Sequence, residues 1–206
     1  MNALTRDLIK LVDMTEEMMK EKEQKEGTAY REKLHLMPPV GWLNDPNGLC
    51  QLNGIYHAFF QYSPFNAEGG VKMWGHYTSK DMIDWEYQGV KLYPDQPFDC
   101  HGVYSGSAFI EDDKMYVYYT GNVKLEDGDF DYINTGRESN TVLVVSEDGK
   151  TFGIKKRTDE KCGLPVRSDL PCARSEGVER RRYLLHDSGC TYKRRCRTGI
   201  DLRVKR

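Results

Sequence analysis

The strongest constraint on the fold lies between residues 54 and 152, where short runs rich in Tyr, Phe, Val and Trp alternate with turn-forming residues. Turn signals such as Asn53-Gly54 and the acidic stretch from Glu111 to Lys114 separate these runs at short intervals. Repeated meanders without long helices are typical of all-β folds, so we expect a sheet array, sandwich or propeller. The predicted strands are Ile55–Tyr62, Met73–Thr78, Gly102–Ile110, Met115–Thr120 and Thr141–Ser146.

The clearest local unit is a hairpin in which Ser105–Ile110 and Met115–Thr120 flank the acidic turn. A similar unit extends from Leu49 to Tyr62. The spacing of about 50 residues between the two units suits the repetition of four-stranded, blade-like sheets.

A different pattern precedes this region, because apolar residues from Leu4 to about Lys25 recur every three or four positions among charged ones. This periodicity predicts an amphipathic helix within residues 1–28. We expect the helix to pack against its own domain, with a partner-binding helix as the alternative.

Residues 154–206 have another composition again. They contain 16 basic residues (Lys and Arg) and 7 acidic residues (Asp and Glu). The rest of the chain contains 14 basic and 25 acidic residues, so the net charge of −2 conceals a basic C-terminal part and an acidic remainder. Four of the six cysteines also lie there, and no period of 2 or 3.6 is sustained. A basic nucleic-acid-binding arm is one interpretation. A poorly ordered basic tail without a partner is the other.

No stretch approaches the 18 or so consecutive apolar residues of a membrane helix, and the N-terminus lacks the pattern of a signal peptide. We therefore expect a cytoplasmic protein with no membrane partner.

The densest candidate for chemistry is the segment Trp42–Gly48, which reads Trp-Leu-Asn-Asp-Pro-Asn-Gly. Pro46 favours an extended conformation at Asp45, and Asn47-Gly48 supplies a turn, so we expect the Asp45 carboxylate to sit at the mouth of a strand beside an aromatic side chain. Such a carboxylate suits a nucleophile. An ordinary Asp-Pro turn is the structural alternative.

Other chemistries are easier to exclude. Ser105 and Ser107 do not lie in the G-x-S-x-G pattern of serine hydrolases. The acidic residues from Asp127 to Asp131 imitate a calcium loop, but Tyr132 stands where the sharp turn requires Gly. The histidines lack metal-ligand spacing, and the tail cysteines contain no C-x-x-C. We predict neither a metal nor a cofactor.

Five ordered blocks over about 120 residues resemble the invertase and sucrose-6-phosphate hydrolase family, glycoside hydrolase family 32. The blocks are Trp42–Gly48, His57–Pro64, Trp74–Trp85, Tyr104–Ala108 and Tyr118–Asn122. The resemblance implies a five-bladed β-propeller, of which residues 29–153 would form about two blades. It also implies a retaining mechanism with two carboxyl groups.

In this family the residue that matches Asp45 is the nucleophile. Matches to positions that bind the fructosyl unit are Trp42, Asn44, Gln61, Trp74, Tyr104 and Ser105. Each of these has a structural alternative, as a turn former or a core aromatic residue.

Two family blocks are missing: an Arg-Asp-Pro block that holds fructose hydroxyls, and a Glu-Cys block that carries the acid/base. Where the first should fall, the chain reads Ala173–Arg182. Back-translation with allowed codons permits GCG AGA TCC for the start of that stretch, and this run read one base later begins Arg-Asp-Pro. We therefore predict a frameshift between about Phe152 and Ala173, which makes residues 154–206 an out-of-frame tail.

The resulting expectation is a hydrolase of terminal β-D-fructofuranosides, sucrose 6-phosphate or sucrose, with little activity in this chain because the general acid is missing. Sister activities on levan or inulin share these motifs. The alternative function, which is binding rather than catalysis, is that of a noncatalytic remnant that binds fructosides. The frameshift would make the basic charge accidental, so we expect a small sugar substrate and no nucleic-acid partner.

Overall fold

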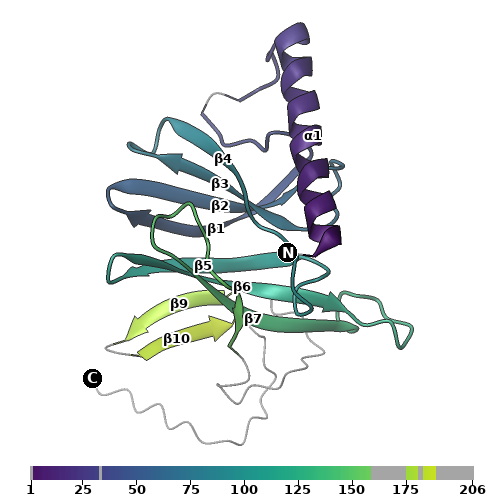
Figure 1. Ribbon diagram of the computed structural model, residues 1–206, viewed down its shortest axis with the longest axis vertical. Coiled ribbons are helices and arrows are strands. Elements are labelled where there is room, and N and C mark those ends of the chain that lie inside the picture. Colours follow the sequence, from purple (N-terminus) through teal and green to yellow (C-terminus); the bar gives the residue numbers. More distant parts are fainter. Residues whose placement is uncertain (1, 33, 159–174, 181–182, 189–206) are drawn as a thin grey trace, which may run out of the picture.

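The computed structural model of this 206-residue protein describes residues 2–32, 34–158, 175–180 and 183–188, the last two ranges as backbone. These described residues form one helix and two four-stranded antiparallel sheets, with a short hairpin beside the second (Figure 1). No helix within the described ranges is both long and apolar enough to cross a membrane.

The first sheet is a meander in which each strand pairs with the next in the chain. Its strands are β1 (Trp42–Leu52), β2 (Ile55–Ser63), β3 (Met73–Ser79) and β4 (Trp85–Leu92). Asn53 and Gly54 have φ values of 50° and 77° and join β1 to β2, as expected for a two-residue hairpin turn. The sequence analysis did not predict β4.

The second sheet repeats this plan. It consists of β5 (Val103–Glu111), β6 (Lys114–Lys124), β7 (Arg137–Ser146) and β8 (Lys156–Arg157) in sequential order. Asp112 and Asp113 both have positive φ, at 48° and 56°, in the acidic turn between β5 and β6. The predicted hairpin and strands of this region are therefore present, and β8 extends the sheet past residue 153.

The core lies between the two sheets, which pack face to face. The first sheet contributes Leu52, Phe59, Trp74 and Leu92, and the second contributes Val103, Met115, Val117, Tyr119, Val142 and Val144. All of these side chains are at most 3% exposed. Burial of this many large apolar side chains is the main force that holds the sheets together.

The helix α1 (Ala3–Glu26) confirms the amphipathic helix predicted from periodicity. Asn2 caps its first turn by accepting a 2.8 Å hydrogen bond from the Thr5 amide. Val12 is 1% exposed, and the Tyr87 hydroxyl of β4 donates to Glu16 at 2.8 Å, so α1 packs on the first sheet. Burial raises the pKa of Glu16.

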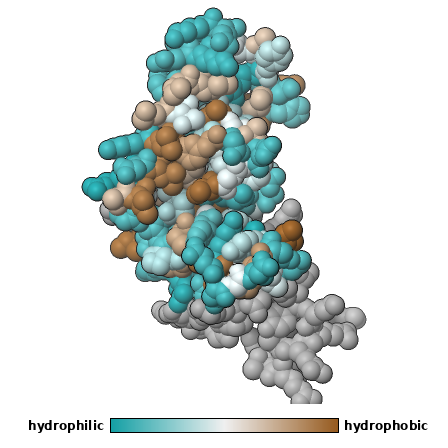
Figure 2. Space-filling view, turned by 90° about the vertical axis from the view of Figure 1, so that its right-hand side faces the viewer, coloured by the Kyte–Doolittle hydropathy of each residue, from teal (hydrophilic) through white to brown (hydrophobic). Residues whose placement is uncertain are grey.

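The outer side of α1 is also partly apolar. Its exposed residues Leu4, Leu11, Met14 and Met18 recur at spacings of seven, three and four. Figure 2 views the molecule from the side that carries α1 and shows apolar residues gathered at mid-height beneath a hydrophilic top.

The predicted basic tail, residues 154–206, is described only in part. Beyond β8, strands β9 (Ser175–Arg180) and β10 (Tyr183–Ser188) form a two-stranded antiparallel sheet, and β9 lies against β5 and β6 (Figure 1). The sequence shows no strand period there, so the pattern of apolar residues did not predict this pairing. The rest of the predicted tail lies outside the described residues.

Candidate active site

Asp45 sits at an irregularity in the first strand. The pairing of β1 with β2 shifts register between Asn44 and Pro46, so Asp45 is the extra residue of a β-bulge. Its φ is 31°, which corrects the extended conformation predicted from the following proline. A bulge re-aims a side chain, and a non-glycine residue at positive φ is a strained feature typical of functional sites.

A chain of hydrogen bonds holds the Asp45 carboxylate. The Ser105 hydroxyl donates to Asp45 Oδ2 at 2.5 Å and accepts from the Gln61 side-chain amide at 2.7 Å. Ser105 and Gln61 are buried, at 5% and 4% exposed, whereas Asp45 is half-buried. Three of the predicted site residues, from β1, β2 and β5, are therefore joined directly, and the carboxylate remains accessible.

The loop after Asp45 ties the two sheets at the same point. The Asn47 side-chain carbonyl accepts a 3.1 Å hydrogen bond from the Gly106 amide of β5. Gly106 must lack a side chain, because a Cβ there would lie 1.9 Å from the Tyr118 carbonyl oxygen of β6. Sequence reasoning treated Asn47 only as a turn former, and its place inside the Trp42–Gly48 motif was the available signal.

Asn44, Gln61 and Trp74 are cross-strand neighbours on β1, β2 and β3. Asn44 is exposed, but Trp74 is fully buried in the core between the sheets. The Trp74 indole N–H donates to the Tyr104 carbonyl at 3.0 Å, so Trp74 positions the strand that carries Ser105. Its predicted contact with a fructosyl unit stays a prediction.

Trp42 and Tyr104, the remaining predicted residues, are brought together by a lysine that the sequence analysis missed. Lys72 Nζ lies 4.9 Å from the centre of the Trp42 ring and 5.8 Å from that of Tyr104. Arg137 also contacts Tyr104, because its guanidinium donates to the phenol oxygen at 3.2 Å. Lys72 stands just before the Trp74–Trp85 block, but nothing in the sequence connects it with Arg137.

Cross-strand pairing places Asn44 and Trp74 beside Gln61, and hydrogen bonds join Gln61 through Ser105 to Asp45. A sequence model of the glycosyl hydrolases family 32 N-terminal domain matches residues 35–162, more than half of the chain. The chain belongs to glycoside hydrolase family 32.

The curated relatives of this family 32 chain include a sucrose-6-phosphate hydrolase of Bacillus subtilis, which is 44% identical over 140 residues, and a raffinose invertase of Escherichia coli, which is 45% identical over 126. The alignments cover 68% and 61% of this chain but only 28% and 26% of the relatives. The chain therefore spans less than a third of the length of these relatives.

Two solved structures resemble the fold. The sucrose-6-phosphate hydrolase of Lactobacillus gasseri is 32% identical with a TM-score of 0.58, over 75% of this chain and 29% of its own. A mutant family 32 β-fructofuranosidase of Bombyx mori, solved with sucrose, is 29% identical with a TM-score of 0.63, over 86% and 36%. Together with the two four-stranded sheets, these findings confirm the predicted part of a β-propeller. The total of five blades stays a prediction.

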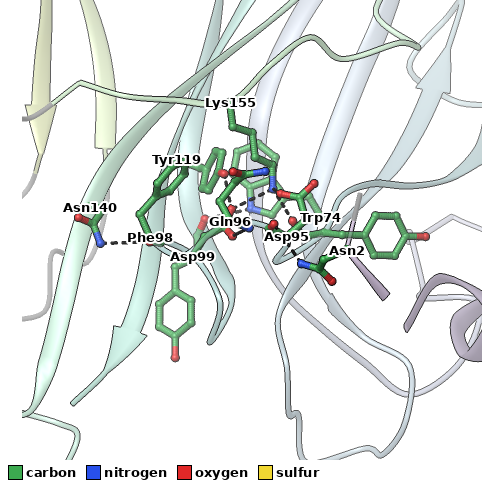
Figure 3. A network of polar contacts seen from close by, with 11 residues as sticks. Asn2, Trp74, Asp95, Gln96, Phe98, Asp99, Tyr119, Asn140 and Lys155 are labelled. Carbon is green, nitrogen blue, oxygen red and sulfur yellow. Dashed lines mark hydrogen bonds and ion pairs between the residues drawn. The ribbon is translucent and has the colours of Figure 1, made fainter. Parts of the chain in front are cut away.

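A second polar cluster of this family 32 chain lies at the linker between β4 and β5 (Figure 3). Lys155 Nζ is 2.8 Å from an Asp95 oxygen and 2.9 Å from Asp99 Oδ2, and it also donates to the Tyr93 carbonyl. The Tyr119 hydroxyl donates to the same Asp99 oxygen at 2.6 Å. Burial, reinforced by the neighbouring Asp99 charge, holds the pKa of Tyr119 well above its ordinary value, so the hydroxyl remains a donor.

A buried histidine pair lies elsewhere between the sheets. His57 Nδ1 and His76 Nε2 are 3.0 Å apart, and the His76 ring stacks on Phe59 with centroids 4.1 Å apart. Burial, with a smaller contribution from His57, lowers the pKa of His76 to about 3. Both rings are at most 4% exposed, so they are structural groups here.

No group of three or more His, Cys, Asp or Glu that could hold a metal ion occurs within the described residues. In the segment that imitates a calcium loop, Asp131 instead accepts hydrogen bonds from the amides of Ile133, Asn134 and Thr135 at 2.9 to 3.1 Å. These bonds lower the pKa of Asp131 and mark it as a turn former.

Proposed function

We propose that residues 35–162 carry the nucleophile half of a β-fructofuranosidase site, with Asp45 as the nucleophile and sucrose or sucrose 6-phosphate as the substrate. The observation that carries this proposal is the hydrogen-bonded chain from Gln61 through Ser105 to Asp45 at a bulge with positive φ. The relatives named sucrose-6-phosphate hydrolase and invertase support the substrate class.

In the proposed reaction, an Asp45 carboxylate oxygen attacks the anomeric carbon of a terminal β-D-fructofuranoside. The bond from that carbon to the leaving oxygen breaks, and a fructosyl ester of Asp45 forms, which water later hydrolyses with net retention. Ser105 orients the carboxylate by occupying one oxygen, and Gln61 fixes the Ser105 hydroxyl. Asn44, Tyr104 and Trp42 would contact the sugar, and Trp74 would hold the Tyr104 backbone.

A retaining site also requires a carboxylic acid about 5 Å from the nucleophile to protonate the leaving oxygen. No residue of this chain matches the Glu-Cys block of the family that would supply it. General acid catalysis contributes on the order of 10²–10⁴-fold, so we expect this chain to turn over sucrose poorly.

The test uses a substrate that needs no acid. Fluoride leaves β-D-fructofuranosyl fluoride without protonation, so Asp45 alone can take up the fructosyl group. We expect intact-mass spectrometry of the 206-residue chain to show a mass increase of one fructosyl unit, and peptide mapping to place it on Asp45.

The matched control is Asp45→Asn, which removes the nucleophilic charge but keeps the size and the hydrogen-bond acceptor. Labelling that persists in this variant, or that maps to another residue, would overturn the assignment of Asp45. Stabilisation by fructose without any adduct would favour the noncatalytic binding remnant. Sucrose, levan oligosaccharides and inulin oligosaccharides can each be added as competitors of the fructosyl fluoride label. The degree to which each one slows the labelling of Asp45 would rank these sugars as ligands.

The predicted frameshift is tested separately. The family match ends at residue 162, inside the predicted interval from about Phe152 to Ala173. Residues 159–174 lie outside the described residues, so only the nucleotide sequence decides. We expect it to contain an alternate-frame Arg-Asp-Pro codon run opposite Ala173–Arg182, and a gene without that run would refute the proposal.

A further inference from the structure

We propose that the exposed face of α1 is a self-association surface, on which α1 of a second copy of this chain packs in the antiparallel direction. The surface is an apolar stripe, and its members are between 50% and 82% exposed: Leu4, Leu11, Met14 and Met18. None of these side chains takes part in the hydrogen-bonded chain at Asp45, so the surface serves assembly rather than the proposed reaction.

The helix α1 has two separate apolar faces. One face packs on the first sheet, where Val12 is buried and Glu16 accepts from the Tyr87 hydroxyl. Since an α-helix turns by about 100° per residue, the line through Leu11 and Met18 lies roughly a third of a turn away from Val12. A helix that packs only on its own domain needs one apolar stripe. The second stripe is therefore left for a partner.

The spacing of the second stripe is that of a coiled-coil seam. Its steps of seven, three and four residues match the first and fourth positions of a heptad repeat, whose side chains insert between those of a facing helix. Asp7 and Glu21 occupy the remaining fourth positions on this line, and Lys25 follows one turn later. The apolar part of the seam is thus bounded by charged residues along the helix.

These charged seam residues decide the direction of the second helix. A parallel pair would place Asp7 against Asp7 and Glu21 against Glu21 of the second copy, and opposed like charges are unfavourable. In an antiparallel pair centred on Leu11 and Met14, Asp7 faces Met18 of the second copy, and Glu21 faces its Leu4. Neither acidic residue then meets a like charge across the seam.

Two ion pairs between the copies favour this antiparallel register. Lys10 and Glu17 flank the Leu11–Met14 centre on one side of the seam, one heptad apart, and both are exposed. When Leu11 packs on Met14 of the second copy, Lys10 faces Glu17 of that copy, and the two-fold symmetry repeats the pair.

Both charged groups are available for such a contact. Among the ion pairs of the described residues, none includes Lys10, and Glu17 has only an exposed 3.9 Å contact with Lys20. A two-fold interface requires a surface that is complementary to itself, and the stripe of α1 meets this requirement in both shape and charge. The occupant that fits it is therefore a second copy of this chain.

Sedimentation velocity of the 206-residue chain at increasing concentration tests the association. We expect a dimer with a dissociation constant on the order of 10 µM, because one helix pair is small beside the roughly 1,600 Å² of a standard interface. The double substitution Leu11→Gln with Met14→Gln should leave a monomer. The matched control is Ile83→Gln, which changes a 72% exposed apolar residue between β3 and β4 and should keep the dimer.

Charge reversal tests the direction and the register. We expect Lys10→Glu and Glu17→Lys each to weaken self-association by about tenfold, since two attractive pairs become two repulsive ones. An equimolar mixture of these two variants should associate again as a heterodimer, and the double reversal in one chain should restore the homodimer. Arg6→Glu makes the same change of charge on α1 away from the seam and should behave like the wild type.

A wild-type chain that stays monomeric overturns the proposal and leaves the face to another partner. A dimer that survives the Leu11 and Met14 substitutions overturns it as well, because association then uses another surface. A dimer weakened by Lys22→Glu but not by Lys10→Glu would be parallel, since a parallel pair sets Glu17 against Lys22. Mixed charge variants that fail to associate would contradict the register.

Circular dichroism checks that α1 forms in each variant. If the double glutamine variant loses helical signal, Leu11→Ala with Met14→Ala replaces it, because alanine has the highest helix propensity and also removes the apolar contact. We expect this alanine variant to be a helical monomer. A helical alanine variant that still dimerises like the wild type would refute the proposed surface.

Discussion

Asp45 on β1 and Asp99 in the linker between β4 and β5 are both carboxylates, yet their surroundings differ. Asp99 is fully buried, and it accepts from Lys155, the Tyr119 hydroxyl and the Gln96 amide. Asp45 is half-buried at a strained backbone position, and within the described residues it accepts one side-chain hydrogen bond, from Ser105.

This difference separates a structural carboxylate from a candidate nucleophile. A buried charge must be paired and hydrogen-bonded, which leaves no acceptor capacity for a substrate. A carboxylate that is oriented by one donor and otherwise accessible keeps an oxygen for chemistry. The comparison predicts that substitutions at Asp99 and Lys155 change stability, whereas substitutions at Asp45 change reactivity.

The largest expected effect on stability comes from Lys155→Met. It leaves the buried Asp99 carboxylate and the partly exposed Asp95 carboxylate without their cation, and removal of one partner of a buried pair costs about 3–5 kcal/mol. Urea unfolding would measure the loss. Lys156→Met, one residue along the chain and exposed, is the matched control and should change stability by less than about 0.5 kcal/mol. Equal effects of the two would refute a structural role for the network.

The second prediction concerns pH and the buried His76. Its pKa is about 3 in the folded protein against 6.5 in the unfolded chain, so protons bind preferentially to the unfolded chain. Stability is therefore complete above pH 6.5 and falls as the pH drops toward 3, by about 2 kcal/mol between pH 7 and 5. His76→Gln should flatten this dependence in urea unfolding at the two pH values. An equally steep dependence in the variant would assign the effect to other groups.

A smaller stability effect is expected for Ser105→Ala, which removes the hydroxyl that joins Gln61 to Asp45. The loss of these hydrogen bonds costs about 1–2 kcal/mol. Labelling of Asp45 by fructosyl fluoride should slow as well, because the carboxylate loses its orientation. Ser105→Thr keeps the hydroxyl and is the control. A slow label with unchanged stability would show that Ser105 positions Asp45 without supporting the fold.

The smallest stability effect should come from Asp45→Asn, within about 0.5 kcal/mol of the parent chain. Asn tolerates positive φ and can accept the Ser105 hydrogen bond, so the bulge should survive. Fructosyl labelling should nevertheless disappear. A large loss of stability in this variant would remove the contrast with Lys155, since both carboxylates would then be structural.

Sequence reasoning anticipated the elements whose signals are local. The helix periodicity, the Asn53-Gly54 turn and the acidic turn before Lys114 all specify backbone conformations over a few residues, and the structure contains them. Reasoning failed where a local rule was overridden. Pro46 favours an extended Asp45, but the bulge imposes positive φ, and β4 was not predicted.

Contacts between distant residues were beyond the same reasoning. Lys72 and Arg137 both lie over the Tyr104 ring although 65 positions separate them in the chain, and Lys155 reaches Asp99 from the residue before β8. Charge and spacing alone could not distinguish these residues from the other lysines and arginines. Only the face-to-face packing of the sheets brings them together.

The sequence by itself determined the helix, most of the strands, the family and the identity of the candidate nucleophile, because these depend on periodicity and on contiguous motifs. The tertiary structure decided which polar residues are buried and paired, that Trp74 belongs to the core, and that two cations lie over the Tyr104 ring. The physical reason is that burial and electrostatic pairing depend on the sum of contacts from both sheets, which no segment of the chain encodes alone.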